Sequence, residues 1–147
     1  MEDSANHREK KGKVLIVDDA PDTLEIIQKL FHYEGYDVLI ASTGEEGVKK
    51  VEEENPEVIL MDINLPGMTG IQCTSSLKGL LPHTLILIVT AFSNNDYIFE
   101  ALRAGASGYL LKRTPPAELL AAIRDVRQGG SPMTSHIARK VVQSFQR

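Results

Sequence analysis

Side chains capable of phosphoryl or metal chemistry stand directly after four short apolar runs of the chain. The run at residues 14–17 is followed by Asp18 and Asp19, the run at 58–61 by Asp62, the run at 85–89 by Thr90, and the run at 109–111 by Lys112. Each run is short enough for a buried strand. If the strands are parallel, their polar ends meet at one edge of the sheet, where open α/β sheets bind ligands. Such a set of carboxylates, hydroxyl and ammonium can handle a phosphoryl group and a divalent cation.

The three aspartates predict a bound cation. Carboxylates within a few ångström of one another raise one another's pKa unless a positive charge neutralises them. Mg²⁺ fits best because it takes oxygen ligands and typically combines one or two carboxylates with phosphate oxygens. No cluster of histidine and cysteine suggests zinc. For Asp18 and Asp19 alone, a helix cap with a solvated neighbour is an equal interpretation, and the other strand ends favour the metal site.

The amino-acid composition limits the classes of protein to which the chain can belong. A chain of 147 residues with 42% hydrophobic and 24% charged residues fits one globular domain with a sizeable core. Its net charge of −4 argues against a surface built to hold nucleic acid. The lone cysteine, Cys73, cannot form an internal disulfide, and no apolar stretch approaches the roughly 20 residues of a membrane span. Residues 1–11 form a polar tail without the apolar segment of a secretory signal, so we expect a cytoplasmic protein without membrane contact.

Strand and helix signals alternate along the chain. The expected strands lie at residues 14–17, 36–41, 58–61, 85–89 and 109–111, and the expected helices at about 21–34, 43–54, 70–80, 96–104 and 116–128. Thr43 is expected to cap its helix, with Glu46 completing a capping box. Strict alternation with short connections predicts a parallel sheet with helices on both faces.

One more apolar stripe follows this alternation. Gly-Gly-Ser-Pro at residues 129–132 is typical of a linker. Ile137, Val141, Val142 and Phe145 then recur at helical spacing. We therefore expect residues 131–147 to contain a linker and the start of a C-terminal helix.

The motifs resemble those of the receiver domain of two-component response regulators. The resemblance rests on residues 14–19, 58–67, 89–91 and 101–112 and covers about residues 12–130. It implies a doubly wound α/β domain with a five-stranded parallel sheet in the flavodoxin-like order 2-1-3-4-5 and helices on both faces. Residues 109–113, 129–133 and 137–139 are most similar to the NarL/LuxR class of DNA-binding regulators. In that class a helix-turn-helix domain follows the linker, and we expect this output domain to be absent from the 147 residues.

The resemblance implies a role for each polar strand end. Asp62 would be the phosphoacceptor that takes a phosphoryl group from the phosphohistidine of a sensor histidine kinase. With Asp62, Asp19 would bind Mg²⁺ directly, and Asp18 would act partly through water. Asn64 would offer its main-chain carbonyl to the metal. Lys112 would contact a phosphoryl oxygen and offset charge on the transferring group.

The resemblance also implies a switch and a control of phosphoryl lifetime. Thr90 and Tyr109 would form the switch pair: a phosphoryl oxygen accepts a hydrogen bond from Thr90, and the inward movement of Thr90 opens space for the Tyr109 ring. Asn64 and Phe92 would flank the approach of the water that hydrolyses the acyl phosphate. A phosphorylation-dependent homodimer is expected, either through the first and last receiver helices or through the face containing Tyr109.

One departure from the family pattern concerns the bond after Lys112. Many receivers place proline there, often in a cis bond, whereas this chain has Arg113. A cis bond without proline costs about 2.5 to 4 kcal/mol, so the cis or trans state of the Lys112 to Arg113 bond is left open.

Two other functions compete with the signalling receiver. A phosphohydrolase of the haloacid-dehalogenase type would carry a second aspartate two residues after Asp62, where this chain has Asn64. A flavodoxin-like cofactor module would need a phosphate-binding loop after the first strand, where Asp18 and Asp19 would repel an anion. The leading hypothesis is a receiver that is no enzyme in the usual sense, although it catalyses its own phosphorylation and dephosphorylation. It would regulate transcription, and contact DNA only through the missing C-terminal domain.

Overall fold

A five-stranded parallel sheet forms the centre of the protein. The computed structural model describes residues 11–146. The strands are β1 (Lys13–Val17), β2 (Asp37–Ala41), β3 (Val58–Met61), β4 (Leu85–Thr90) and β5 (Gly108–Leu111). Their order in the sheet is β2-β1-β3-β4-β5, and all four pairings are parallel. The predicted fold and strand order are confirmed.

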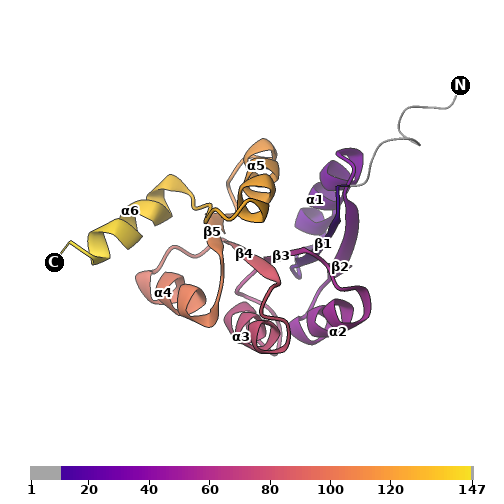
Figure 1. Cartoon of the computed structure of the whole chain (residues 1–147), viewed down its shortest axis with the longest axis horizontal. Helices are drawn as coiled ribbons and strands as arrows, with labels where there is room; N and C mark the ends of the chain where they lie inside the picture. Colours follow the sequence, from indigo (N-terminus) through magenta and orange to yellow (C-terminus); the bar gives the residue numbers. More distant parts are fainter. Residues whose placement is uncertain (1–10, 147) are drawn as a thin grey trace, which may run out of the picture.

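Helices cover both faces of this sheet, which explains why its strands are almost uninterrupted apolar runs. One face carries α1 (Pro21–Tyr33) and α5 (Pro116–Arg127), and the other carries α2 (Gly44–Glu54), α3 (Gly70–Leu80) and α4 (Asn95–Ala104) (Figure 1). Successive side chains of β1 point to opposite faces: Ile16 packs in the cluster with α1 and α5, and Leu15 packs in the cluster with the other three helices. Each face therefore has its own buried core.

Local signals in the sequence set most helix boundaries. Asn55 ends α2 with a left-handed φ of 50°, and Thr43 caps the start of that helix by accepting a hydrogen bond from the Glu46 amide at 3.0 Å. The predicted capping box is wrong in one detail, because the Glu46 carboxylate accepts from the Ser42 amide instead of the Thr43 amide. A complete capping box begins α3, where the side chain of Thr69 pairs with the Gln72 amide and the side chain of Gln72 with the Thr69 amide.

The segment after α5 is joined to the sheet. The Tyr109 amide donates to the Pro132 carbonyl at 3.1 Å, and the Thr134 amide donates to the Tyr109 carbonyl at 3.2 Å. Met133 thereby forms a parallel bridge with Tyr109 on the outer edge of β5. Helix α6 (Ser135–Ser144) follows and lies at the β5 end of the sheet (Figure 1). Its residue Ile137 is completely buried.

Three features considered from the sequence can be compared with the structure: the polar tail, the bond after Lys112 and the length of the apolar segments. Residues 1–10 of the predicted polar tail lie outside the described residues, whereas the Lys11 amide donates to the Gly35 carbonyl at 3.0 Å. The bond between Lys112 and Arg113 is trans, like every peptide bond in residues 11–146. In that range, no helix has both the length and the apolar composition that crossing a bilayer requires.

Candidate functional site

The strand register brings the predicted polar residues to one edge of the sheet. Asp18 and Asp62 follow β1 and β3, and the Asp62 amide donates to the Val17 carbonyl at 3.0 Å. Thr90 ends β4, and the Lys112 amide donates to the Thr90 carbonyl at 2.8 Å. The ends of β1, β3, β4 and β5 are therefore adjacent, as expected for the carboxyl edge of an open α/β sheet.

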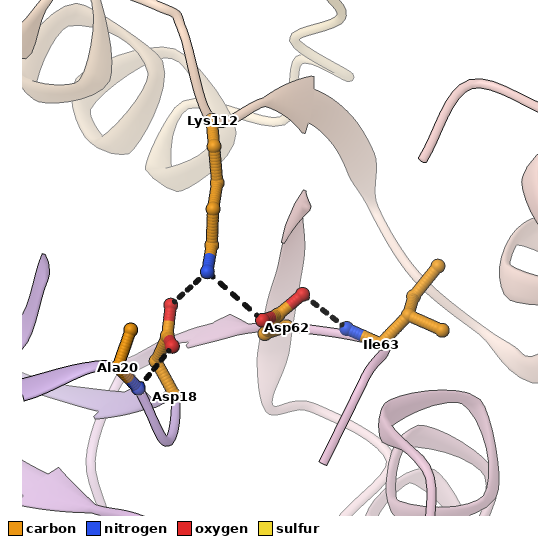
Figure 2. A network of polar contacts seen from close by, with 5 residues as sticks. All are labelled: Asp18, Ala20, Asp62, Ile63 and Lys112. Atoms are coloured by element: carbon orange, nitrogen blue, oxygen red, sulfur yellow. Dashed lines mark hydrogen bonds and ion pairs between the residues drawn. The ribbon is translucent and has the colours of Figure 1, made fainter. Parts of the chain in front are cut away.

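Lys112 connects two buried carboxylates at this edge. Its Nζ atom lies 2.8 Å from Asp18 Oδ2 and 3.0 Å from Asp62 Oδ2 (Figure 2). The second oxygen of each carboxylate accepts from a backbone amide, Oδ1 of Asp18 from Ala20 at 2.9 Å and Oδ1 of Asp62 from Ile63 at 2.8 Å. Asp18 is 4% exposed and Asp62 is 5% exposed. Both carboxylates are thus held in fixed orientations.

Burial and charge shift the pKa values of these groups. Burial raises the pKa of Asp18 above its usual range, even though Lys112 and the Ala20 amide oppose the rise, and the nearby Asp62 carboxylate adds to it. Burial alone lowers the pKa of Lys112, but its contacts with Asp18 and Asp62 outweigh that effect and raise it. Lys112 is therefore a permanent positive charge at neutral pH.

The arrangement of the carboxylates fits a hard divalent cation. Asp18, Asp19 and Asp62 each offer a carboxylate oxygen, and these oxygens all lie within 4.8 Å of one another. The cluster holds three acidic side chains, and the Lys112 ammonium pairs with two of them, so an excess of negative charge favours a cation. The side chains of Asp19 and Asn64 are exposed, which leaves the cluster open to solvent on that side. Oxygen ligands that leave room for water suit Mg²⁺.

Thr90 carries the most unusual polar atom of the site. The residue is completely buried, and its Oγ1 atom has no hydrogen-bond partner among residues 11–146. An unsatisfied buried hydroxyl costs free energy, and such groups are rare in folded proteins. Its position at the end of β4, beside the Lys112 strand end, makes an oxygen of a bound anion a suitable partner.

The second member of the predicted switch pair is already inside the protein. Tyr109 is completely buried, and its hydroxyl donates to the Phe92 carbonyl at 2.7 Å. Burial raises the pKa of Tyr109, and the charge of Asp62 adds to the rise. The Phe92 ring packs at a tilt against Tyr97 of α4, with 5.2 Å between ring centroids. The Tyr109 ring therefore lies inside the protein, and its hydroxyl is held by the loop that follows β4.

Three contributors to the site were not predicted from the sequence. The amides of Ala20 and Ile63 orient the two carboxylates, and backbone donors leave no signature in residue type. Gly70 begins α3, and a Cβ atom there would collide with the carbonyl oxygen of Asp62. Its place directly after the cap residue Thr69 was a signal that could have indicated this close approach.

Comparison with known proteins agrees with this geometry. Residues 14–124 match the family model of the response regulator receiver domain. The chain belongs to this family. Response regulators are signalling proteins that work with sensor histidine kinases. Membership of the family gives no support to a phosphohydrolase of the haloacid-dehalogenase type.

Individual relatives of the receiver place it in the NarL/LuxR class. The chain is 36% identical over 137 residues to the oxygen regulatory protein NreC of Staphylococcus aureus, which covers 90% of this chain and 63% of that protein. A crystal structure of a LuxR-family response regulator from Aurantimonas sp. SI85-9A1 is similar, with a TM-score of 0.86, 31% identity, and coverage of 92% of this chain and 99% of that one. The receiver domain of the putative regulator NarL from Mycobacterium tuberculosis has a TM-score of 0.78 and 27% identity, covering 82% of this chain and 99% of that one.

Proposed function

We propose that this receiver accepts a phosphoryl group on Asp62 from the phosphohistidine of a sensor histidine kinase. The observation that carries the proposal is the buried Asp62 carboxylate, held by an amide and lying 3.0 Å from the Lys112 ammonium. A carboxylate oxygen forms a bond to phosphorus while the bond from phosphorus to the kinase imidazole breaks. The imidazole nitrogen keeps the electron pair of that bond, and the product is an acyl phosphate on Asp62.

The neighbours of Asp62 support this transfer through charge and hydrogen bonding. Lys112 offsets the negative charge that builds on the phosphoryl oxygens, which is the main form that catalysis takes in phosphoryl transfer. The unsatisfied Thr90 hydroxyl donates to one of those oxygens and thereby gains the partner that it lacks. When bound, Mg²⁺ supplies further positive charge at the transferring group, held by Asp19, Asp62 and the Asn64 carbonyl, with Asp18 acting partly through water.

We propose that phosphorylation of this receiver leads to regulation of transcription. The relative NreC is longer than the chain, which spans 63% of its length. DNA would therefore be contacted by a domain outside the 147 residues.

Phosphorylation-dependent homodimerisation remains part of the proposal and is tested by light scattering before and after phosphorylation. On α5 the large apolar side chains face the sheet, whereas α1 exposes Ile26 at 60%, which favours α1 as part of a dimer surface.

The deciding experiment is phosphorylation of the purified chain by acetyl phosphate and Mg²⁺, followed by intact-mass measurement. We expect one added phosphoryl group on the wild type and none on Asp62→Asn. Asp96→Asn is the matched control, because this aspartate is exposed in α4 and should leave the adduct unchanged. Asp19→Ala should weaken Mg²⁺ binding. A full adduct on Asp62→Asn would refute the assignment of the phosphoacceptor.

A further inference from the structure

The C-terminal segment of residues 132–144 contacts both parts of the proposed switch. These are β5, which carries Tyr109, and the loop that follows Thr90 at the end of β4. Its first part pairs with the outer edge of β5 through the Pro132 carbonyl and the Thr134 amide. The Thr134 hydroxyl also accepts from the Leu111 amide at 2.9 Å, one residue before Lys112. Gly108 makes the close approach feasible, because a Cβ atom there would collide with the Pro132 carbonyl oxygen. The segment is therefore a fitted part of the receiver.

A charged hydrogen bond connects α6 to the loop between β4 and α4. The Lys140 ammonium donates to the Ser93 carbonyl at 2.6 Å across 47 residues of sequence. Ile137 is completely buried in the core cluster on the α4 side of the sheet, and Val141 packs against that cluster. Packing of the apolar side of α6 against the core thus brings Lys140 to the loop, and the charged hydrogen bond to the Ser93 carbonyl stabilises this contact.

The loop connects Thr90 at the phosphoryl site to Ser93 at the Lys140 contact, a stretch of only four residues. Thr90 ends β4 with its unsatisfied hydroxyl, the Phe92 carbonyl accepts from the buried Tyr109 hydroxyl at 2.7 Å, and the Ser93 carbonyl accepts from Lys140. Consecutive Cα atoms are about 3.8 Å apart, so the Cα atoms of Thr90 and Ser93 lie at most about 11 Å apart. A shift of the Thr90 end therefore changes the position of both carbonyls.

We propose that Lys140 is a positioning residue for the phosphoryl site, acting through the Ser93 carbonyl on the loop that carries Thr90. This inference rests on the proposed function of Asp62. An oxygen of the phosphoryl group gives the Thr90 hydroxyl a partner and stabilises the loop in the position in which Phe92 and Ser93 meet Tyr109 and Lys140. Phosphorylation and docking of α6 then favour the same loop position.

Coupling of this kind acts equally in both directions. If a bound phosphoryl group strengthens docking of α6, docking of α6 must strengthen binding of the phosphoryl group by the same factor. Residues 132–144 are then more than a passive connection to an output domain. They increase the affinity of the site for its ligand and report whether that ligand is bound.

The test measures the affinity of the whole chain for beryllofluoride with Mg²⁺, a non-covalent mimic of the phosphoryl group, by calorimetry. Lys140→Met keeps the apolar stem and removes the charge, and we expect it to weaken binding about 5-fold, the lower end of typical coupling. Lys140→Arg should restore the wild-type affinity. Arg139→Met is the matched control, because this neighbouring side chain on α6 is exposed and should bind as the wild type does.

Hydrogen exchange of the wild type provides a second measurement that needs no variant. We expect beryllofluoride to slow exchange of the α6 amides, including the Ala138 amide that donates to the Thr134 carbonyl. Wild-type affinity in Lys140→Met, or α6 exchange that beryllofluoride leaves unchanged, would overturn the inference while leaving the phosphoryl site intact. A wild-type chain that binds no beryllofluoride would instead refute the proposed function itself.

Discussion

The backbone of Thr90 is paired with Lys112, but its hydroxyl is not paired with anything in residues 11–146. The Lys112 amide donates to the Thr90 carbonyl at 2.8 Å, whereas Thr90 Oγ1 is buried without a hydrogen-bond partner. The backbone of this strand end is therefore paired within the sheet, whereas the hydroxyl is retained at a cost in stability. Such a cost is understandable if the hydroxyl acquires its partner only when the site binds a phosphoryl group.

Thr90→Val separates the stability of the receiver from its function. Valine has the shape of threonine and replaces the unsatisfied hydroxyl by a methyl group, so we expect the free energy of unfolding to rise by about 1 kcal/mol. Phosphorylation by acetyl phosphate should become slower, because the donor to the phosphoryl oxygen is lost. Urea unfolding and intact mass measure the two effects. A less stable Thr90→Val protein would show that the hydroxyl is satisfied in the free receiver.

Gly70→Ala should distort the site from the backbone side. The added Cβ atom would meet the Asp62 carbonyl oxygen and the backbone of Ile63, so overpacking should lower the free energy of unfolding by about 1 to 3 kcal/mol. Phosphorylation should slow as well, because the Ile63 amide orients Asp62. Urea unfolding and the mass assay check both expectations.

Gly79 provides the matched control in the same helix. A Cβ atom at Gly79 would meet nothing within 4 Å, and alanine is the better helix former. Gly79→Ala should therefore raise the free energy of unfolding by up to about 1 kcal/mol and leave phosphorylation unchanged. Equal stability losses in both variants would argue against a specific clash at Asp62.

The buried thiol of Cys73 should make the stability of the protein depend on pH, and this effect is separate from the proposed phosphoryl site. Burial raises the pKa of this thiol to about 11 from the usual 9.0, and the charge of Glu45 contributes. Because the unfolded chain ionises first, the thiol contributes its full stabilisation below about pH 9 and loses it as the pH rises towards 11. The loss amounts to about 3 kcal/mol for two pKa units.

Comparison with Cys73→Ala isolates this effect from other groups that titrate in the same range. The variant lacks the thiol, so the stability difference between wild type and variant should shrink as the pH rises from about 9 to about 11. Urea unfolding at several pH values gives this difference. A difference that stays constant over the range would show that the thiol ionises equally well in the folded chain.

The sequence predicts the strands and their polar ends well because each end follows an uninterrupted apolar run. Helix bounds agree to within a single residue for the same kind of reason, since glycine, proline and cap residues act locally. The hydrogen bond from the Tyr109 hydroxyl to the Phe92 carbonyl could not be predicted in this way, because it depends on how the loop after β4 packs against β5. The contact between Lys140 and Ser93 spans 47 residues, and a lysine on a short helix is usually solvated. Long-range contacts made by ordinary residue types leave no local pattern.

Phe92 provides the last prediction, which concerns the lifetime of the acyl phosphate. Its ring is partly buried, packs against Tyr97, and offers no group that could orient a water molecule towards Asp62. Phe92→Glu would place a carboxylate on the loop that also carries Thr90, and a carboxylate can accept a hydrogen bond from an attacking water. We expect about 3- to 10-fold faster loss of the phosphoryl group, below the full effect of an optimised general base.

Two further variants separate a positioned carboxylate from other causes. Phe92→Lys removes the ring without adding a base, so any change common to both variants reports the loss of apolar cover. Tyr97→Glu adds the same charge to the neighbouring ring position, and we expect it to leave the lifetime close to that of the wild type. Loss of phosphoprotein after removal of the donor is followed by intact mass, with circular dichroism as the test of folding. If neither Phe92 variant alters the lifetime, Phe92 only covers α4 and does not control access of water to the acyl phosphate.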